Sequence, residues 1–278
     1  MKDLSNENVI HVKKTGIEYL QFRKLLEYND VINHAYGIGI DRNYRTAKSK
    51  GEENYCKAIE DYKDLCDAIE INYINCVKPC QEHSKNIRNV KQKINKNNVD
   101  FEQEEYKGTD GLMTNQTNIA LATTNADCIL LMFFDPVKNV IANIHSGWRG
   151  TLQKISVNAV NKMKNEFGCN AQDIICCICP SIRKCHFEVH SDVQKLYYEE
   201  FKNLQEINDI IVPIPNQEKW SIDTVEINKI ILKQIGLKEE NIIDCGICSV
   251  CNSDIIHSFR VEKQGYGLGT AIIELKGN

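Results

Sequence analysis

Short apolar runs bounded by polar turns recur along the chain. Two of them, residues 129–134 and 140–144, flank an Asp135-Pro136 break. Apolar runs of this length beside a proline predict two buried β-strands joined by a turn. Cys128 opens the first run and His145 closes the second. If the two strands pair antiparallel, the thiol and the imidazole lie at the same end of the sheet.

Helices are predicted where apolar residues recur every three or four positions. The stripes over residues 55–69 and 152–167 are the clearest, and further helices are predicted over 19–27, 192–204 and 220–236. Residues 86–106 are polar and charged and should form an exposed excursion. Strand patterns cover the remaining segments: 31–40, 72–78, 108–114 (a turn and strand entry), 119–124, 173–179, 242–248, 255–260 and 268–275.

The order of these elements predicts one mixed α/β domain. A chain of 278 residues fits a single domain of that class. The sequence has no internal repeat and no linker rich enough to divide it. We place the domain at residues 31–278, after an N-terminal extension of residues 1–30.

Composition narrows the class of protein. The net charge of -4, with both signs interspersed, gives no case for binding nucleic acid. The first residues lack the apolar core of a signal peptide, and no run approaches the roughly 18 apolar residues of a membrane span. The thirteen cysteines are therefore expected to stay reduced in the cytoplasm.

Cys128, His145 and His83 are the leading candidates for a functional site. Two imidazoles and one thiolate make a three-ligand set that leaves a fourth position open, as in catalytic zinc sites. The same set also suits copper. A thiol beside an imidazole can instead act as a nucleophile and its base. The plainest interpretation is a buried cysteine, a histidine that ends a strand, and a histidine in an exposed loop.

Residues next to this set are candidates for supporting roles. Asp127 adjoins Cys128, so on a regular strand the two would face opposite sides, and they can act together only if the chain bends. The Gly147–Thr151 segment is expected to be a flexible loop that enters the helix over 152–167. A helix entry of this kind, with Arg149 beside it, can hold an anion such as phosphate. Arg149 is equally compatible with a surface position.

The C-terminal third contains the run Cys245-x₂-Cys248-x₂-Cys251, and Cys179-Pro180 lies elsewhere. Part of an iron–sulfur signature has this form, but the fourth ligand is not at its place. On a strand, the three thiols would not share a face. We expect them to be mostly buried thiols.

Several short motifs together resemble the YfiH/laccase-domain family, also called the polyphenol oxidase or purine nucleoside phosphorylase family. The resemblance runs from about Asn33 to the end, and its most specific part is the pair Ala-Asp-Cys and His-x-Gly-Trp-Arg-Gly. The motifs occur in the family's order: Gln81-Glu82-His83-Ser84, Asp110-Gly111-Leu112-Met113-Thr114, Ala126-Asp127-Cys128, His145-Ser146-Gly147-Trp148-Arg149-Gly150, Pro180-Ser181-Ile182 with Phe187-Glu188-Val189, and Ser258-Phe259-Arg260.

This resemblance implies a single α/β domain of mixed sheets layered with helices, of the cytotoxic necrotizing factor/YfiH-like architecture. It also implies zinc held by His83, Cys128 and His145. It also implies phosphorolysis of adenosine, inosine and 5′-methylthioadenosine, and deamination of adenosine. The partners would be a purine nucleoside and phosphate, for a monomer or small homo-oligomer. We assign catalytic roles to the three ligands and Asp127, and substrate or phosphate binding to Gly147, Arg149 and Arg260.

The sequence departs from the family pattern where the family commonly carries arginines. Val261 follows Arg260 where a second arginine is usual, and Leu268 follows Gly267 where Gly-Arg is common. Phe187 stands for the usual Tyr. Without these two arginines near an anion site, the preferred substrate and the reaction rate are expected to differ from those of the family.

Three other functions remain open. A copper-dependent, laccase-like oxidase needs many imidazoles, and the chain has seven histidines. A metal-free cysteine hydrolase would use Cys128 as nucleophile and His145 as base. A weakly active zinc-binding protein would bind zinc without turnover.

Overall fold

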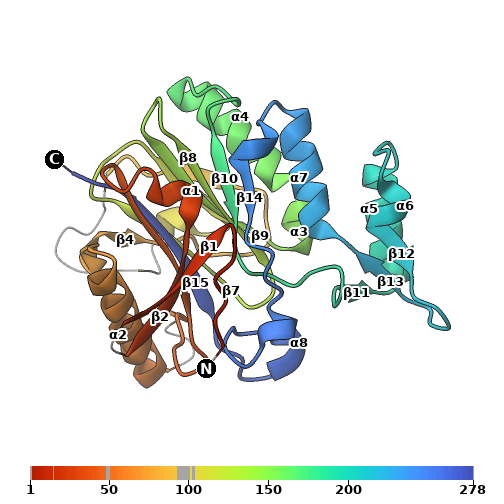
Figure 1. Ribbon diagram of the computed structural model, residues 1–278, viewed down its shortest axis with the longest axis horizontal. Coiled ribbons are helices and arrows are strands. Elements are labelled where there is room, and N and C mark those ends of the chain that lie inside the picture. Colours follow the sequence, from red (N-terminus) through yellow and green to blue (C-terminus); the bar gives the residue numbers. More distant parts are fainter. Residues whose placement is uncertain (1, 15, 48–50, 93–100, 102–103, 278) are drawn as a thin grey trace.

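Two six-stranded β-sheets pack face to face at the centre of the protein (Figure 1). The computed structural model describes residues 2–14, 16–47, 51–92, 101 and 104–277. In the first sheet the strand order is β1 (Val9–Lys14), β2 (Ile17–Phe22), β3 (Ile32–Ile38), β15 (Gly269–Leu275), β7 (Ala120–Asn125) and β4 (Cys76–Val77). In the second it is β14 (Ile242–Asp244), β10 (Ile175–Ile178), β8 (Ile129–Asp135), β9 (Val140–Ser146), β6 (Gly111–Thr114) and β5 (Ile87–Asn89).

Strand β8 shows why the central run is apolar at every position. Successive side chains on a strand point to opposite faces of the sheet. Leu130 and Met132 enter the core between the two sheets, whereas Leu131 and Phe133 enter a second core on the outer face. Both faces of β8 are therefore buried, as is typical of a continuous apolar strand.

Helices cover the outer face of each sheet (Figure 1). Helix α2 (Glu52–Ala68) buries Tyr62, Leu65 and Cys66 against the first sheet. Helices α4 (Ile155–Phe167) and α7 (Thr224–Gln234) pack against the second sheet. The result is a four-layer arrangement of helix, sheet, sheet and helix, so the expected α/β fold of layered mixed sheets is confirmed.

A smaller unit extends from one end of the second sheet (Figure 1). It has a three-stranded sheet and two helices, which share a core with one face of α7. Its elements are β11 (Glu188–Val189), α5 (Ser191–Phe201), α6 (Ile207–Ile210), β12 (Ile211–Pro213) and β13 (Trp220–Ile222).

Two connections carry the chain from the first sheet to the second. Residues 126–128 lie between β7 and β8, and residues 78–86 lie between β4 and β5. Asp127 has a φ of 84°, so the chain bends sharply there. Both connections carry residues of the predicted metal set.

Strands β8 and β9 pair antiparallel, and Leu130 lies opposite His145. The expectation that Cys128 and His145 meet at one end of the sheet is therefore confirmed. The predicted strand over 31–40 and helix over 55–69 correspond to β3 and α2. The excursion predicted over 86–106 lies partly outside the described residues; within them it contains β5 and a short 3₁₀ turn, Glu104–Tyr106. The expected exposure is wrong at four apolar or aromatic positions that are buried, Ile87, Val90, Phe101 and Tyr106.

Some predicted elements are wrong in type or extent. The segment predicted as a strand over 255–260 has no strand, and helix α8 (Phe259–Glu262) begins inside it. The helix predicted over 19–27 is strand β2 up to Phe22, followed by the short helix α1 (Arg23–Leu26). The helix predicted over 220–236 begins only at Thr224, because residues 220–222 pair as β13 and Asp223 caps α7.

The loop expected at Gly147–Thr151 is also wrong. Gly147 is the N-cap of a five-residue helix, α3 (Trp148–Leu152). The helix expected to start at 152 begins at Ile155, because Lys154 adopts a left-handed conformation with φ 56° and separates α3 from α4.

Residues at the N-terminus belong to the first sheet in this structure. Strand β2 pairs with both β1 and β3. Leu20, Phe22 and Leu25 are fully buried in the core between the sheets. The segment assigned from sequence as an extension thus contributes to the main core.

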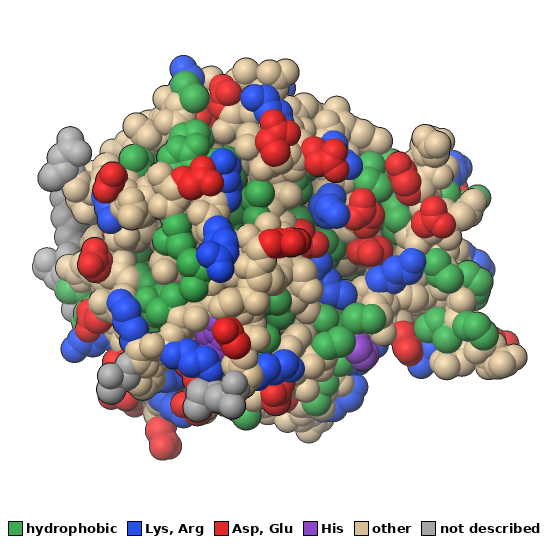
Figure 2. All heavy atoms as spheres, viewed as in Figure 1, with side chains coloured by type: hydrophobic (Ala, Val, Ile, Leu, Met, Phe, Trp, Pro, Cys, Tyr) green, Lys and Arg blue, Asp and Glu red, His purple; other side chains and the backbone are tan. Residues whose placement is uncertain are grey.

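Charged side chains of both signs are intermingled over the face shown in Figure 2, with apolar patches between them. This distribution agrees with the modest net charge of -4. Among the described residues, no helix combines the length and the apolar character that crossing a membrane requires.

Candidate metal and substrate site

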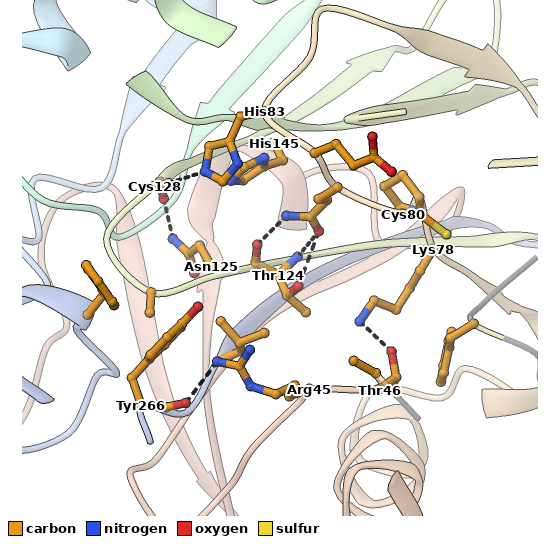
Figure 3. A pocket seen from close by; sticks show the side chains of 18 residues that line it. Arg45, Thr46, Lys78, Cys80, His83, Thr124, Asn125, Cys128, His145 and Tyr266 are labelled. Atoms are coloured by element: carbon orange, nitrogen blue, oxygen red, sulfur yellow. Dashed lines mark hydrogen bonds between the residues drawn. The ribbon is translucent and has the colours of Figure 1, made fainter. Parts of the chain in front are cut away.

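The structure brings His83, Cys128 and His145 together, as the sequence predicts. Their ligand atoms lie within 4.8 Å of one another, and the Cys128 sulfur is 3.8 Å from His83 Nε2. The three residues come from the two inter-sheet connections and the end of β9. Figure 3 shows them on one side of a cavity.

Asp110 contacts both histidines and is a site residue to which the sequence assigned no role. Its carboxylate accepts a hydrogen bond from His145 Nδ1 at 2.8 Å and from the His83 backbone N–H at 3.0 Å. It is fully buried. Asp110 immediately precedes β6, whose first residue lies opposite Ile144. The strand order that creates this proximity is not visible in the sequence, so only the Asp110-Gly111 motif pointed to this position.

Gly147 lies against the two imidazoles. A Cβ at this position would be 2.5 Å from His83 Cδ2 and 3.3 Å from His145 Cε1. The backbone itself would tolerate other residues, with φ -64° and ψ 173°. The glycine is therefore required by the close approach of His83 rather than by backbone flexibility.

Cys128 and His145 perturb each other's pKa. Burial alone would raise the pKa of Cys128, but the positive charge of His145 and hydrogen bonds from both histidines lower it to about 6. Burial alone would lower the pKa of His145, but Cys128 and Asp110 raise it to about 9. Without a metal, the pair is a thiolate and an imidazolium near neutral pH.

The donor set fits a metal ion. His145 Nδ1 is engaged by Asp110, so Nε2 is the nitrogen available as a ligand. An imidazole whose other nitrogen is held by a carboxylate is the usual arrangement at zinc. His83, Cys128 and His145 would hold the ion and leave one position open.

Two cavities meet at this set. The larger, of about 520 Å³, contains all three ligands, and the smaller, of about 350 Å³, contains His83 and Cys128. Ala126 and Phe259 also line both cavities. A small molecule in either cavity would lie beside the ligands.

The larger cavity carries cationic side chains away from the ligands (Figure 3). Lys78 is 5% exposed and donates to Thr46 Oγ1 at 3.0 Å. Arg45 lies 4.2 Å from the ring centroid of Tyr266 and donates to the Tyr266 carbonyl. Glu82 is the acidic residue among the lining side chains. Neither residue was predicted from the sequence: Arg45 lies far from the motifs along the chain, and Lys78 lies just outside the Gln81–Ser84 motif.

The smaller cavity is mainly apolar. Trp148, Ile182, Phe187 and Val189 line it. These residues come from α3, from the segment that joins the second sheet to the smaller unit, and from β11 of that unit. A flat apolar ring is the kind of ligand that such a surface accepts.

Asp127 supports the turn that carries Cys128. Its two carboxylate oxygens accept hydrogen bonds from Ser249 Oγ at 2.6 Å and from the Arg260 backbone N–H at 2.7 Å. It also lines the smaller cavity. The chain bends at Asp127, as it must if Asp127 and Cys128 are to act together, and the Asp127 carboxylate binds the C-terminal segment.

The two predicted arginines lie in different environments. Arg260 lines the smaller cavity, and its guanidinium donates to the carbonyls of His186 and Glu188 at 2.8 and 3.3 Å. Arg149 is exposed and lies 4.2 Å from the ring centroid of Trp148. It lines neither cavity at the ligand set.

The fold and site define an α/β protein of the YfiH type. A crystal structure from Bacillus licheniformis, described as the hypothetical protein YfiH, superposes with a TM-score of 0.82 at 23% identity, covering 93% of this chain and 96% of that chain. Residues 48–276 match the family described as multi-copper polyphenol oxidoreductase laccase. The chain belongs to this family.

Relatives carry two kinds of activity in their names. Purine nucleoside phosphorylase YlmD of Bacillus subtilis is 29% identical over 196 residues, which are 70% of this chain and 69% of that protein. Adenosine deaminase RL5, from an unknown prokaryotic organism, is 26% identical over 247 residues, which are 88% of this chain and 93% of that protein.

Proposed function

We propose that the protein is a zinc-dependent purine nucleoside enzyme. Its reactions would be phosphorolysis of adenosine, inosine and 5′-methylthioadenosine, together with deamination of adenosine. The observation that carries the proposal is the position of His83, Cys128 and His145 between a cavity with cationic side chains and an apolar cavity. The names of the relatives support the choice of substrates.

The apolar cavity would hold the purine. Trp148 and Phe187 offer ring faces against which the base can pack. Phosphate would lie toward Arg45 and Lys78, because positive charge at the cavity wall favours an anion. This phosphate position replaces the one expected from the sequence beside Arg149, because Arg149 lines neither cavity.

Phosphorolysis would join a phosphate oxygen to C1′ of the ribose and break the bond between C1′ and the purine nitrogen. The electron pair of that bond leaves with the base, which takes up a proton. Deamination would add water at C6 of adenine and release ammonia. Zinc bound by the three ligands would supply a Lewis acid at its open position.

The protein's own residues would orient these reactions. Asp110 fixes the His145 imidazole through Nδ1 and fixes His83 through the backbone. Asp127 would act as a positioning residue, because its carboxylate holds the turn that carries Cys128. Phe259 lines both cavities and would contact a ligand in either one.

Product analysis by mass spectrometry tests this proposal. Zinc-loaded protein is incubated with adenosine, inosine or 5′-methylthioadenosine, with and without phosphate. We expect a purine base and a ribose 1-phosphate product only with phosphate, and inosine from adenosine in either condition. Cys128→Ala should abolish both activities, whereas Cys56→Ser, at an exposed cysteine on α2, should retain them. Absence of product from all three nucleosides would refute the proposal and leave a zinc-binding protein without this turnover.

A metal-free cysteine hydrolase is a second candidate with its own observation. Cys128, His145 and Asp110 form a thiol, an imidazole and a carboxylate in contact, and the pKa of Cys128 is lowered to about 6. Such an arrangement activates a nucleophile. Hydrolysis by chelator-treated protein that is lost on alkylation of Cys128 would favour this candidate over the zinc enzyme.

A copper-dependent polyphenol oxidase is the remaining alternative. The described residues contain two groups that could hold a metal, and together these supply three imidazoles. That supply suits one copper ion at His83, Cys128 and His145 better than a multicopper centre. Copper content near one ion per chain with phenol oxidation, and no nucleoside products, would favour this alternative.

A further inference from the structure

A second cluster of metal-ligand side chains lies outside the cavities. It combines Cys185 and His186, which precede β11, with Cys248 and Cys251, which follow β14. We propose that these four side chains form a structural zinc site that joins the two segments. The proposal does not depend on the proposed nucleoside chemistry.

The distances within the cluster match a tetrahedral ion. The Cys185 sulfur lies 3.6 Å from that of Cys248 and 3.9 Å from that of Cys251. Nδ1 of His186 lies 3.2, 3.7 and 3.6 Å from the sulfurs of Cys185, Cys248 and Cys251. Zinc with tetrahedral bonds of about 2.3 Å to sulfur and about 2.0 Å to nitrogen would hold its ligand atoms roughly 3.5–3.8 Å apart.

The donor set indicates a structural rather than a catalytic site. Three thiolates and one imidazole fill all four positions of zinc, and closed sites of this kind stabilise folds. None of the four residues lines either cavity at the first ligand set. Thiolate-rich sets also favour zinc over magnesium or calcium, which prefer oxygen ligands.

The cluster uses a different set of cysteines from the Cys-x₂-Cys-x₂-Cys run. Cys245 is 1% exposed, and its sulfur accepts a hydrogen bond from Arg183 instead. The other two members of the cluster are Cys185 and His186, which lie about 60 residues earlier in the chain. The run was expected to supply mostly buried thiols, and Cys245 and Cys248 are buried, whereas Cys251 is exposed.

The cluster lies next to residues that line the apolar cavity. Phe187 and Glu188, next to the ligands, line that cavity. Arg260 donates to the carbonyls of His186 and Glu188, and Ser249, next to Cys248, donates to Asp127. Zinc at the cluster would fix the segments that carry these contacts, so its ligands would be positioning residues.

Metal analysis of the full-length protein tests the proposal. The protein is purified with reductant and Zn²⁺, and loosely bound zinc is removed by gel filtration. We expect two zinc ions per chain in the wild type and one in both Cys251→Ser and Cys128→Ser. The double variant should bind none. Cys56→Ser, which changes another exposed cysteine, should still bind two.

The absorption spectrum of Co²⁺-substituted protein distinguishes the two sites by their ligands, which helps if a variant folds poorly. In Cys128→Ser, the thiolate-to-cobalt absorption should remain, and its visible bands should be those of a tetrahedral ion with several sulfur ligands. One zinc ion in the wild type that is lost in Cys128→Ser but kept in Cys251→Ser would overturn the proposal. The proposal would also be overturned by a disulfide in protein purified with reductant. Its signs would be an intact mass lower by two hydrogens and a peptide that links Cys185 to Cys248 or Cys251.

Discussion

Cys128 and His145 set each other's protonation state in the metal-free protein. The attraction between thiolate and imidazolium overcomes the cost of burying both charges, and Asp110 holds the imidazolium from its other side. A metal ion at this set would replace the proton on His145 Nε2 and would bind the same thiolate. The ion pair therefore keeps the ligands close together before metal binds.

The rate of alkylation at Cys128 reports this pairing. In zinc-free protein, the iodoacetamide reaction should rise with pH around a midpoint near 6, because the thiolate is the reactive form. In His145→Asn the midpoint should move upward toward that of an ordinary thiol. Mass spectrometry of the peptide that contains Cys128 measures the rate apart from the other cysteines. A wild-type midpoint above 8 would contradict the pairing.

Leu268 and Val261 occupy two positions where the family commonly carries arginine, but only one faces the site. Leu268 lines the larger cavity, whereas Val261 is 49% exposed and lines neither cavity. Arg45 lines the same cavity as Leu268. The loss of a cation at 268 thus concerns the proposed phosphate position, and the loss at 261 does not.

Leu268→Arg should lower the KM for phosphate about fivefold, as expected for about 1 kcal/mol from a partly exposed charge pair. Steady-state phosphorolysis of inosine measures the effect. Val261→Arg adds the same charge at the surface and should leave the KM unchanged. Equal effects of the two variants would indicate a general influence of net charge.

Helix α3 is the element that most directly shapes the metal site. Its N-cap, Gly147, leaves space for His83, and its first residue, Trp148, lines the apolar cavity. The other glycine in the motif, Gly150, has more room, because a Cβ there would come no closer than 3.4 Å to Ile155. The two glycines therefore have different structural roles.

Gly147→Ala should weaken zinc binding at the first site by at least about tenfold, since the new methyl group would displace the His83 ring. Gly150→Ala should bind zinc as the wild type does and gain helix propensity. Chelator competition in a Cys251→Ser background measures the affinity of the first site alone. Unchanged affinity in Gly147→Ala would show that His83 is not a ligand.

At the scale of elements, the sequence predicts best those contacts that form between neighbouring segments of the chain. Strands β8 and β9 are adjacent in sequence, so their apolar runs and the turn between them reveal the Cys128–His145 end. The 255–260 segment was predicted as a strand, but hydrogen bonds at Ser258 start helix α8 within it. There, Ser258 accepts from the Val261 N–H, and Glu262 accepts from the Ser258 N–H.

Long-range contacts explain what the sequence did not reveal at the site. Asp110 reaches His145 through the pairing of β6 with β9, and Arg45 reaches the larger cavity from a segment that matches no motif. Cys185 and His186 meet Cys248 only through the arrangement of loops at the end of the second sheet. Spacing along the chain carries no signal for these contacts.

At the scale of the whole molecule, the two sheets share one core that includes the N-terminal strands. The family match begins at residue 48, after β1, β2 and β3. Yet Val9, Leu20, Phe22 and Leu25 are fully buried in the core between the sheets. The N-terminal residues are therefore part of the folding unit in this structure.

Deletion of residues 1–30 should prevent stable folding. Burial of four large apolar side chains contributes about 6–12 kcal/mol, which is comparable to a typical net stability of roughly 5–15 kcal/mol. Removal of residues 1–2 alone should change the thermal midpoint little, because Lys2 is exposed. Circular dichroism and thermal unfolding measure both effects. A deletion variant that unfolds cooperatively near the wild-type temperature would make residues 1–30 a dispensable extension.

The two cavities that share His83, Ala126, Cys128 and Phe259 have a pharmacological consequence. One compound could carry an acidic group into the larger cavity and a flat aromatic group into the smaller one, with a zinc-binding group between them. Under the proposed function, such a bisubstrate inhibitor would compete with nucleoside and phosphate at the same time. Because the linker gives the second group a high effective concentration once the first is bound, its affinity would far exceed that of either fragment.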